Sequence, residues 1–206
     1  MRNHGFTIWF TGLPSAGKST LARLLQETFE EAGLSVAILD GDEVRQRLTK
    51  GLGFTKEDRE ENIRRIAYVS KLLTQVGAIA IVAAISPYQR SRDRARAEIG
   101  NFIEVYVECP LQTCMNRDVK GLYAKAQKGE IKNFTGISDP YEPPLHPDIS
   151  VRSDREVPLE NIKTIIEHLV THNLVSTSLV SHILREDSES MSRNIHERTT
   201  TNQWAI

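Results

Sequence analysis

A glycine-rich segment near the amino terminus carries the residues best suited to hold a phosphate group. It reads Gly12-Leu13-Pro14-Ser15-Ala16-Gly17-Lys18-Ser19-Thr20 and satisfies the pattern G-x-x-x-x-G-K-[ST]. Glycines let such a loop turn successive backbone N–H groups toward an anion. The lysine can bridge the β- and γ-phosphates, and the hydroxyl after it can bind Mg²⁺. The whole segment is therefore predicted to bind the phosphates of a nucleotide, although a turn that binds nothing is the alternative.

The residues on either side of this loop supply the context that a phosphate site needs. The apolar and β-branched run over residues 6–10 predicts a buried strand that ends just before the loop. A helix that begins near Gly17 and ends near Gly33 would add the positive end of its dipole to the site. Its apolar residues recur at helical spacing: Leu21, Leu24, Leu25 and Phe29.

Two carboxylates follow the next predicted strand, which covers residues 36–39. They are Asp40 and Asp42. Because ligands of a parallel sheet bind at the carboxyl ends of its strands, we expect both carboxylates beside the phosphate loop. The Mg²⁺ that accompanies ATP would then be bound by Ser19 and Asp40. Alternatively, Asp42 caps a short helix that runs through Arg45, and the two roles are compatible.

Thr55 is followed three residues later by Asp58, a capping-box spacing that predicts the start of a helix over residues 58–76. This helix turns polar groups inward at its amino-terminal end. Arg59 and Asn62 share one face with an apolar stripe one turn later. Because burying an arginine without a partner is costly, we expect an anionic ligand at Arg59. Arg64 and Arg65 are expected to face solvent. The rest of the inward face consists of Ile63, Ile66, Ser70 and Leu73.

Two aromatic residues and a basic segment complete the candidate site. Phe54 and Phe134 lie in glycine-containing loops, where each could simply pack locally. Together beside Arg59 they favour a planar group held between them, and thus a second nucleotide as acceptor. Residues 117–136 predict a lid that excludes water and brings positive charge to the reacting phosphate. Its basic residues are Arg117, Lys120, Lys125, Lys128 and Lys132.

Apolar runs alternate with helical patterns along the chain, which predicts an α/β fold. The expected strands are residues 6–10, 36–39, 79–85, 102–107 and 149–151, and further helices are expected over 111–129 and 158–168. Continuous apolar strands separated by helices indicate a mainly parallel sheet covered on both faces. We expect one domain over residues 1–174. Residues 175–206 would be an extension, with a short helix over 174–184 and then a disordered tail.

Composition excludes several classes of function. The formal net charge of −1 gives no general basis for binding nucleic acid or a membrane surface. The chain lacks an apolar run long enough to span a membrane, and its first residues resemble no signal peptide. Cys109 and Cys114 are expected to be reduced packing residues. These features are typical of a cytoplasmic enzyme.

Over about residues 5–172 the chain closely resembles adenylylsulfate kinases, which have a three-layer P-loop kinase fold. The resemblance rests on motifs beyond the phosphate loop. They are Asp40-Gly41-Asp42, Gly53-Phe54, Asp58-Arg59, Asn62-Ile63-Arg64-Arg65, Ile85-Ser86-Pro87-Tyr88, Asp118-Val119-Lys120-Gly121-Leu122-Tyr123, Gly129-Glu130-Ile131-Lys132 and Phe134-Thr135-Gly136-Ile137.

The resemblance implies transfer of the γ-phosphate of ATP to the 3′-hydroxyl of adenosine 5′-phosphosulfate, a step of sulfate assimilation. Phe54 and Phe134 would sandwich the acceptor's adenine, and Arg117 would contact ATP. The residues implied around the acceptor are Asp42, Arg45, Phe54, Arg59, Asn62, Ile85, Ser86, Lys120, Phe134 and Thr135.

Four residues are assigned to catalysis: Lys18, Asp42, Ser86 and Lys120. Lys18 would hold the triphosphate, Asp42 would orient the acceptor hydroxyl and take its proton, and Lys120 would neutralise developing charge. Ser86 matches a serine that is often described in the family as a phosphoserine intermediate. Since no His or Lys adjoins Ser86 in sequence to activate it, we favour direct transfer, with Ser86 as a ligand of the acceptor or metal.

Two other functions stay open at this point. One is a different small-molecule kinase on the same scaffold. The other is a non-catalytic nucleotide-binding partner of a sulfurylase. The expected partners are ATP, adenosine 5′-phosphosulfate and a second copy of the chain, with functional coupling to ATP sulfurylase and no nucleic acid or membrane.

Overall fold

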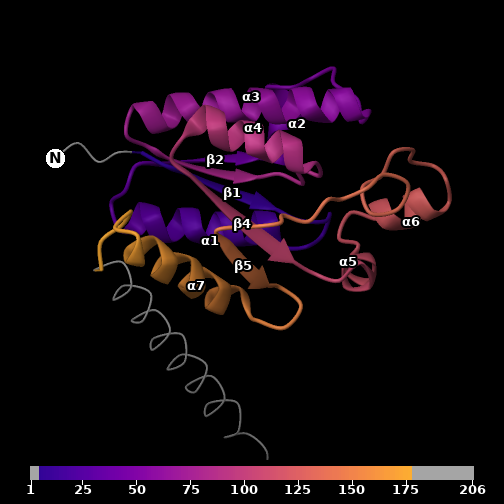
Figure 1. Ribbon diagram of the computed structural model, residues 1–206. Coiled ribbons are helices and arrows are strands. Elements are labelled where there is room, and N and C mark those ends of the chain that lie inside the picture. The colour runs from indigo at the N-terminus through magenta and orange to yellow at the C-terminus, as the bar shows by residue number, and fades with distance from the viewer. Residues whose placement is uncertain (1–4, 178–206) are drawn as a thin grey trace, which may run out of the picture. The chain divides into compact units, whose positions relative to one another are not determined.

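A five-stranded parallel sheet forms the centre of the computed structural model, which describes residues 5–177 (Figure 1). The strands lie in the order β2-β3-β1-β4-β5, and every neighbouring pair is parallel. Every residue of β1 and β3 is buried, as expected for central strands of a parallel sheet that is covered on both faces. The predicted fold class is confirmed. The strands are β1 Thr7–Thr11, β2 Val36–Asp40, β3 Ile79–Ala83, β4 Phe102–Glu108 and β5 Ile149–Arg152.

Helices connect these strands and cover the sheet. The chain crosses from β1 to β2 in one direction and then runs through β3, β4 and β5 in the other. Because crossover connections are right-handed, this reversal places α1 on one face and α3 with α4 on the opposite face (Figure 1). The helices are α1 Lys18–Glu31, α2 Gly41–Arg47, α3 Lys56–Gln75, α4 Gln89–Ile99, α5 Leu111–Arg117, α6 Leu122–Gln127 and α7 Pro158–Thr171.

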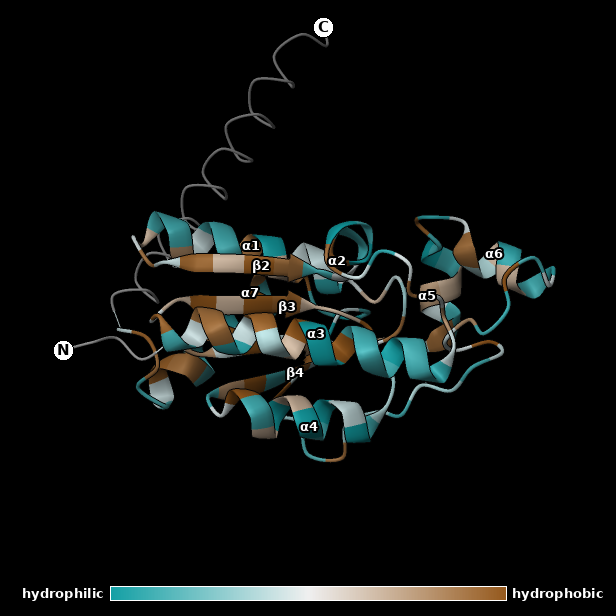
Figure 2. Ribbon diagram, turned by 90° about the horizontal axis from the view of Figure 1, so that it is seen from above, coloured by the Kyte–Doolittle hydropathy of each residue, from teal (hydrophilic) through white to brown (hydrophobic). Residues whose placement is uncertain are grey.

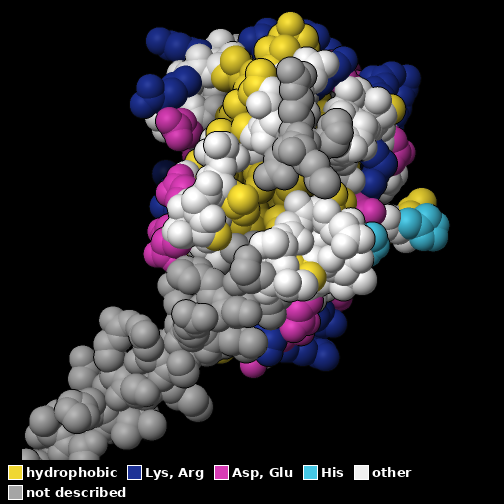
Figure 3. All heavy atoms as spheres, turned by 90° about the vertical axis from the view of Figure 1, so that its left-hand side faces the viewer, with side chains coloured by type: hydrophobic (Ala, Val, Ile, Leu, Met, Phe, Trp, Pro, Cys, Tyr) yellow, Lys and Arg dark blue, Asp and Glu magenta, His cyan; other side chains and the backbone are white. Residues whose placement is uncertain are grey.

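A hydrophobic core lies between the sheet and the pair α3 and α4. The ring centroids of Trp9 and Phe102 are 5.4 Å apart, and Ile63 and Ile66 of α3 pack in the same cluster. Figure 2 shows mainly apolar strands, whereas the helices carry both polar and apolar residues. On the face shown in Figure 3, hydrophobic side chains gather at the centre, with groups of basic and acidic side chains around them.

The start of α3 agrees with its predicted cap. The Thr55 hydroxyl oxygen accepts a hydrogen bond from the Asp58 backbone N–H at 3.1 Å and donates to the Asp58 carboxylate at 2.9 Å. Arg59 and Asn62 are buried as expected. Arg64 and Arg65 both pair with Glu61 on the outer side of the helix.

Two predictions of secondary structure need correction. The helix predicted over residues 111–129 is divided into α5 and α6, because Asp118 and Gly121 adopt positive φ angles of 22° and 65°. The Asp118 carboxylate then accepts hydrogen bonds from the backbone N–H groups of Tyr123 and Ala124, which caps α6. The helix α4 was not predicted because its sequence is almost entirely polar.

The polar helix α4 is held to the sheet by a buried ion pair. Arg92 of α4 donates from Nε to the Glu104 carboxylate of β4 at 2.8 Å, and both side chains are almost fully buried. Burial raises the pKa of Glu104, and the positive charges of Arg92 and Arg96 oppose that shift. The pair therefore adds to the small apolar contact that Ala95 and Ile99 of α4 make with the core.

We expect Glu104→Gln to lower the free energy of unfolding by about 3–5 kcal/mol, because it leaves the Arg92 charge buried without a counter-charge. Urea denaturation at 25 °C measures this change. Glu43→Gln is the matched control, since Glu43 pairs with Arg47 on the exposed surface of α2. Equal effects of the two substitutions would contradict the prediction.

Contacts divide the chain into two compact units, Met1–Ile165 and Ile166–Ile206, and the boundary falls within α7. The predicted domain boundary after residue 174 stays a prediction. Most of the predicted helix over 174–184 and the predicted tail lie outside the described residues. Cys109 and Cys114 are buried free thiols, as expected. Within the described part of the chain, every helix is too short or too polar to cross a membrane.

Candidate active site

The phosphate loop joins the end of β1 to the start of α1, as predicted. Gly12 has a φ of 153°, and a Cβ there would lie 2.6 Å from the Val107 carbonyl oxygen, so only glycine fits. Gly17 precedes α1 in the left-handed conformation and gives the helix no side-chain cap. The first N–H groups of α1 therefore remain suited to an anion.

The ammonium group of Lys18 lies inside this loop. Its Nζ donates to the carbonyl oxygens of Gly12 and Leu13 at 3.0 Å and 2.7 Å. Burial lowers the pKa of Lys18 to about 8, while the nearby Cys114, Asp40 and Asp42 raise this pKa and Lys120 lowers it slightly. A triphosphate at this position would restore a full counter-charge to the buried cation.

This pKa predicts that ATP binding takes up a proton near pH 8. Bound phosphates favour the charged amine, so the pKa of Lys18 rises on binding and ATP affinity falls as the pH increases above about 8. Calorimetry in buffers of different ionisation enthalpy measures the uptake. Lys18→Met should remove it, and the same uptake in that variant would assign the proton to another group.

Asp40, one of the two predicted metal ligands, lies at the end of β2. Its Oδ1 accepts from the Asp42 backbone N–H at 3.0 Å, so Asp40 caps α2. The alternative that Asp42 caps this helix is therefore wrong. The second carboxylate oxygen of Asp40 is buried and has no protein partner.

The Asp40 carboxylate and the Ser19 hydroxyl fit the requirements of Mg²⁺. Mg²⁺ prefers oxygen ligands and usually keeps waters and substrate phosphates in its shell, so few protein ligands are needed. Among residues 5–177, no group of three or more His, Cys, Asp or Glu side chains could hold a metal alone. The unpartnered oxygen of Asp40 is consistent with a ligand shell that nucleotide and water complete.

The structure brings Asp42 and Lys120 together. They form an ion pair although 78 residues separate them, and their side chains are 63% and 55% exposed. The segment after α5 is tied to the phosphate loop through Tyr123, whose hydroxyl donates to the Pro14 carbonyl oxygen at 3.0 Å. Arg117 also contacts this loop: its Nη1 donates to the Ser15 carbonyl oxygen at 3.5 Å and to Ser153 Oγ at 3.3 Å. The basic segment thus lies over the loop, where a lid would have to act.

Arg59 is buried, but the expectation that its burial requires an anionic ligand is wrong. Its Nη1 donates to Thr135 Oγ1 at 2.8 Å, and its Nε lies 3.5 Å from the Asp139 carboxylate. It also donates to the carbonyl oxygens of Phe54 and Asn133. Because protein groups satisfy the guanidinium, no anion is needed to explain its burial. A contact of Arg59 with the acceptor stays a prediction.

The two predicted stacking residues differ in exposure. Phe54 is 53% exposed, and the Arg45 guanidinium lies 4.4 Å from its ring centroid. Phe134 is buried and packs edge-on against Tyr123 with centroids 5.0 Å apart. Asn62, which is also predicted to contact the acceptor, is buried, and its side-chain oxygen accepts from the Thr49 hydroxyl at 2.8 Å. Of the two predicted stacking rings, Phe54 is therefore the one more open to a planar ligand.

Ser86 follows β3 in a conformation that is unusual for serine. Its φ is 47°, it is 1% exposed, and its Oγ accepts from the Trp9 indole N–H at 2.9 Å. The preceding carbonyl, of Ile85, accepts from the Thr11 hydroxyl at 2.8 Å. No described His or Lys side chain is hydrogen-bonded to Ser86 as a base. This geometry suits a fixed turn better than a nucleophile.

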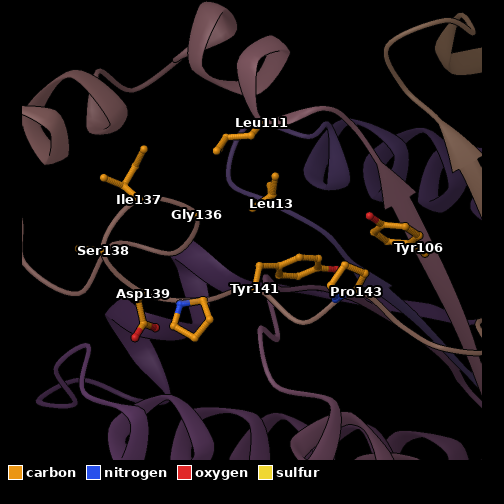
Figure 4. A pocket seen from close by; sticks show the side chains of 10 residues that line it. Leu13, Tyr106, Leu111, Gly136, Ile137, Ser138, Asp139, Tyr141 and Pro143 are labelled. Carbon is orange, nitrogen blue, oxygen red and sulfur yellow. The ribbon is translucent and has the colours of Figure 1, made fainter.

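A cleft of about 570 Å³ next to the phosphate loop was not predicted from the sequence. Figure 4 shows Leu13 and Leu111 beside the loop that carries Gly136, and the rings of Tyr106 and Tyr141 farther along the cleft. A Cβ at Gly136 would lie 3.0 Å from a Leu13 methyl carbon, so the two loops pack tightly. No local signal distinguished these side chains, because the cleft forms only where separate loops meet.

The family model described as adenylylsulphate kinase matches residues 4–152. This chain belongs to the adenylylsulfate kinase family. The adenylyl-sulfate kinase of Halothermothrix orenii is 59% identical over 170 residues, which cover 82% of this chain and 92% of that relative. That of Rippkaea orientalis is 56% identical, with 82% and 93% covered. The resemblance inferred from the motifs is confirmed.

Solved structures agree with this assignment. The Mycobacterium tuberculosis APS kinase CysC, in complex with AMPPNP and APS, has a TM-score of 0.76 and 44% identity, and the match covers 81% of this chain and 98% of that one. Shikimate kinase from Aquifex aeolicus has a TM-score of 0.50 at 18% identity, covering 83% and 100%, and shares the fold alone.

Proposed function

We propose that this protein is an adenylylsulfate kinase. It transfers the γ-phosphate of ATP to the 3′-hydroxyl of adenosine 5′-phosphosulfate and releases ADP and 3′-phosphoadenylyl sulfate. The observation that carries this proposal is the meeting of Asp42 and Lys120 at the sheet edge that also holds the phosphate loop. Membership of the family and the similarity to a structure that holds both APS and AMPPNP support the choice of acceptor.

Different residues of the chain bind the donor nucleotide and the acceptor nucleotide. The phosphate loop and Lys18 bind the triphosphate, and Ser19 with Asp40 would hold Mg²⁺, which supplies charge neutralisation when bound. Asp42 orients the acceptor hydroxyl and accepts its proton. Lys120 leaves its pairing with Asp42 and approaches the transferring phosphoryl group. Direct transfer requires no phosphorylated Ser86, in agreement with the buried and hydrogen-bonded state of that hydroxyl.

A coupled assay of ADP release tests the proposal. We expect ADP formation from ATP to depend on adenosine 5′-phosphosulfate and to saturate with it, while AMP, gluconate and shikimate give little more than the background rate. Saturation with another acceptor at a higher kcat/KM would assign the protein to a different small-molecule kinase. Nucleotide binding without turnover of any acceptor would favour the non-catalytic alternative.

We also propose a cytoplasmic homodimer that is coupled functionally to ATP sulfurylase. The acceptor is an adenylylated sulfate, so a reaction that joins sulfate to an adenylyl group must supply it. A hexameric APS kinase from Thiobacillus denitrificans, 34% identical with a TM-score of 0.66, supports self-association; the match covers 85% of this chain and 30% of that one. Light scattering of the purified protein tests the dimer, and a monomer at micromolar concentration would contradict it.

A further inference from the structure

The buried guanidinium of Arg92 connects two backbone segments at the acceptor side of the site. It makes four hydrogen bonds and is almost completely buried. One bond goes to the Glu104 carboxylate, which supplies the counter-charge. The others come from the two terminal nitrogens and reach groups that flank the candidate acceptor site.

The first of these groups is the carbonyl oxygen of Ser86, which accepts from Arg92 Nη1 at 2.6 Å. Ser86 has a positive φ of 47°. A residue other than glycine keeps such a conformation only where surrounding bonds hold it. Arg92 therefore fixes the turn that ends β3, and with it the direction of Ser86 and Ile85.

The second group is the carbonyl oxygen of Glu142, which accepts from Arg92 Nη2 at 2.8 Å. Two more bonds reinforce this contact. The Glu142 backbone N–H donates to the Pro87 carbonyl oxygen at 2.8 Å, and the Gln89 backbone N–H donates to the Glu142 carboxylate at 2.7 Å. The carboxylate thus caps α4, whose own N-cap residue gives no side-chain bond.

Glu142 lies at the end of a segment that also contains Phe134 and Thr135. Between them, Asp139 accepts from the Tyr88 hydroxyl at 2.9 Å and lies 3.5 Å from Arg59. The segment is therefore joined to residues 86–92 at both Asp139 and Glu142. The guanidinium of Arg92 donates to the backbone of both segments, at Ser86 and at Glu142, from one rigid, planar group.

We propose that Arg92 is a positioning residue for the acceptor nucleotide. Its guanidinium holds the Ser86 turn and the segment over residues 134–142 at a fixed separation, so that the acceptor enters a preformed pocket. Glu104 supplies the counter-charge of the guanidinium but touches neither segment. This inference rests on the proposed function only for the identity of the acceptor.

Arg92→Lys and Glu104→Gln separate positioning from stability. Arg92→Lys keeps a positive charge opposite Glu104 but loses the planar, forked guanidinium. Glu104→Gln keeps the guanidinium but loses its counter-charge. For Arg92→Lys we expect the KM for adenosine 5′-phosphosulfate to rise by roughly 10–10²-fold, as small displacements in a site can do, with the KM for ATP within twofold. For Glu104→Gln we expect lower stability with both KM values within threefold.

Glu142→Ala weakens the same connection at an exposed residue, because it removes the carboxylate that accepts from the Gln89 backbone N–H, and it provides a second variant should Arg92→Lys fail to fold. We expect it to raise the acceptor KM in the same direction by a smaller factor. Equal acceptor KM values in wild type and in both Arg92→Lys and Glu142→Ala would overturn the proposal. An equal rise in Glu104→Gln and Arg92→Lys would also overturn it, because the effect would then follow stability alone.

Hydrogen exchange keeps this test independent of the substrate. The backbone amides of Gln89 and Glu142 should exchange at least tenfold faster in Arg92→Lys than in wild type, while amides within α1 remain unchanged. If wild type fails to phosphorylate adenosine 5′-phosphosulfate, the proposed function is wrong. The exchange data still test whether Arg92 holds the two backbone segments in place. Unchanged exchange at Gln89 and Glu142 would overturn the positioning role.

Discussion

Asp42→Ala should lower kcat by about 10²–10⁴-fold while ATP still binds, because a positioned base contributes roughly that factor to proton transfer. Asp42 lies at the start of α2, where Asp40 fixes the backbone and Lys120 pairs with the carboxylate. Its loss removes the group that orients the acceptor hydroxyl and leaves the phosphate loop intact. Steady-state kinetics with both substrates and calorimetry with an ATP analogue measure the two effects separately.

Glu43→Ala is the matched control, since it removes a carboxylate from the adjacent, exposed position of the same helix. It should retain nearly full activity. Turnover of Asp42→Ala within threefold of wild type would remove Asp42 from the mechanism. A loss of ATP binding equal to the loss of turnover would mean that Asp42 acts on the donor rather than on the acceptor.

Lys18→Met should lower kcat by about 10²–10³-fold, the usual effect of removing one preorganised charged donor from a developing anion. Methionine preserves the length of the side chain and is easily buried, so the loop should keep its fold. ATP binding should weaken as well, since Lys18 supplies the buried positive charge inside the loop.

The same change at an exposed lysine, Lys50→Met, controls for the general loss of a positive charge. Thermal denaturation should show a stable Lys18→Met protein, because burial of the charged amine is itself unfavourable. Activity close to wild type in Lys18→Met would show that the loop's backbone amides suffice. In that case the role assigned to the lysine would be wrong.

The sheet and the phosphate loop could be predicted because local sequence determines them. The apolar run before Gly12, the helical spacing after Lys18 and the cap at Thr55 each act over a few residues, and the structure agrees with all three. The helix α4 was not predicted, because its buried face consists of Ser91, Arg92 and Ala95. Such a face has no apolar periodicity.

Long-range contacts account for the rest. The burial of Arg59 was predicted, but its partners Thr135 and Asp139 lie more than 70 residues away, and they satisfy the charge that an anion was expected to satisfy. In the same way, the ion pair of Asp42 with Lys120 and the capping of α4 by Glu142 join distant segments. Spacing along the chain carries no signal for contacts of this kind.

A crystal structure with an ATP analogue and adenosine 5′-phosphosulfate bound together would test the proposed transfer most sharply. We expect the analogue's phosphates in the loop around Lys18. We expect the acceptor's adenine between Phe54 and Phe134, with its 3′-hydroxyl hydrogen-bonded to Asp42 and directed at the γ-phosphate. An acceptor bound elsewhere, such as in the cleft beside Tyr106, with its 3′-hydroxyl away from Asp42, would contradict direct transfer at this site.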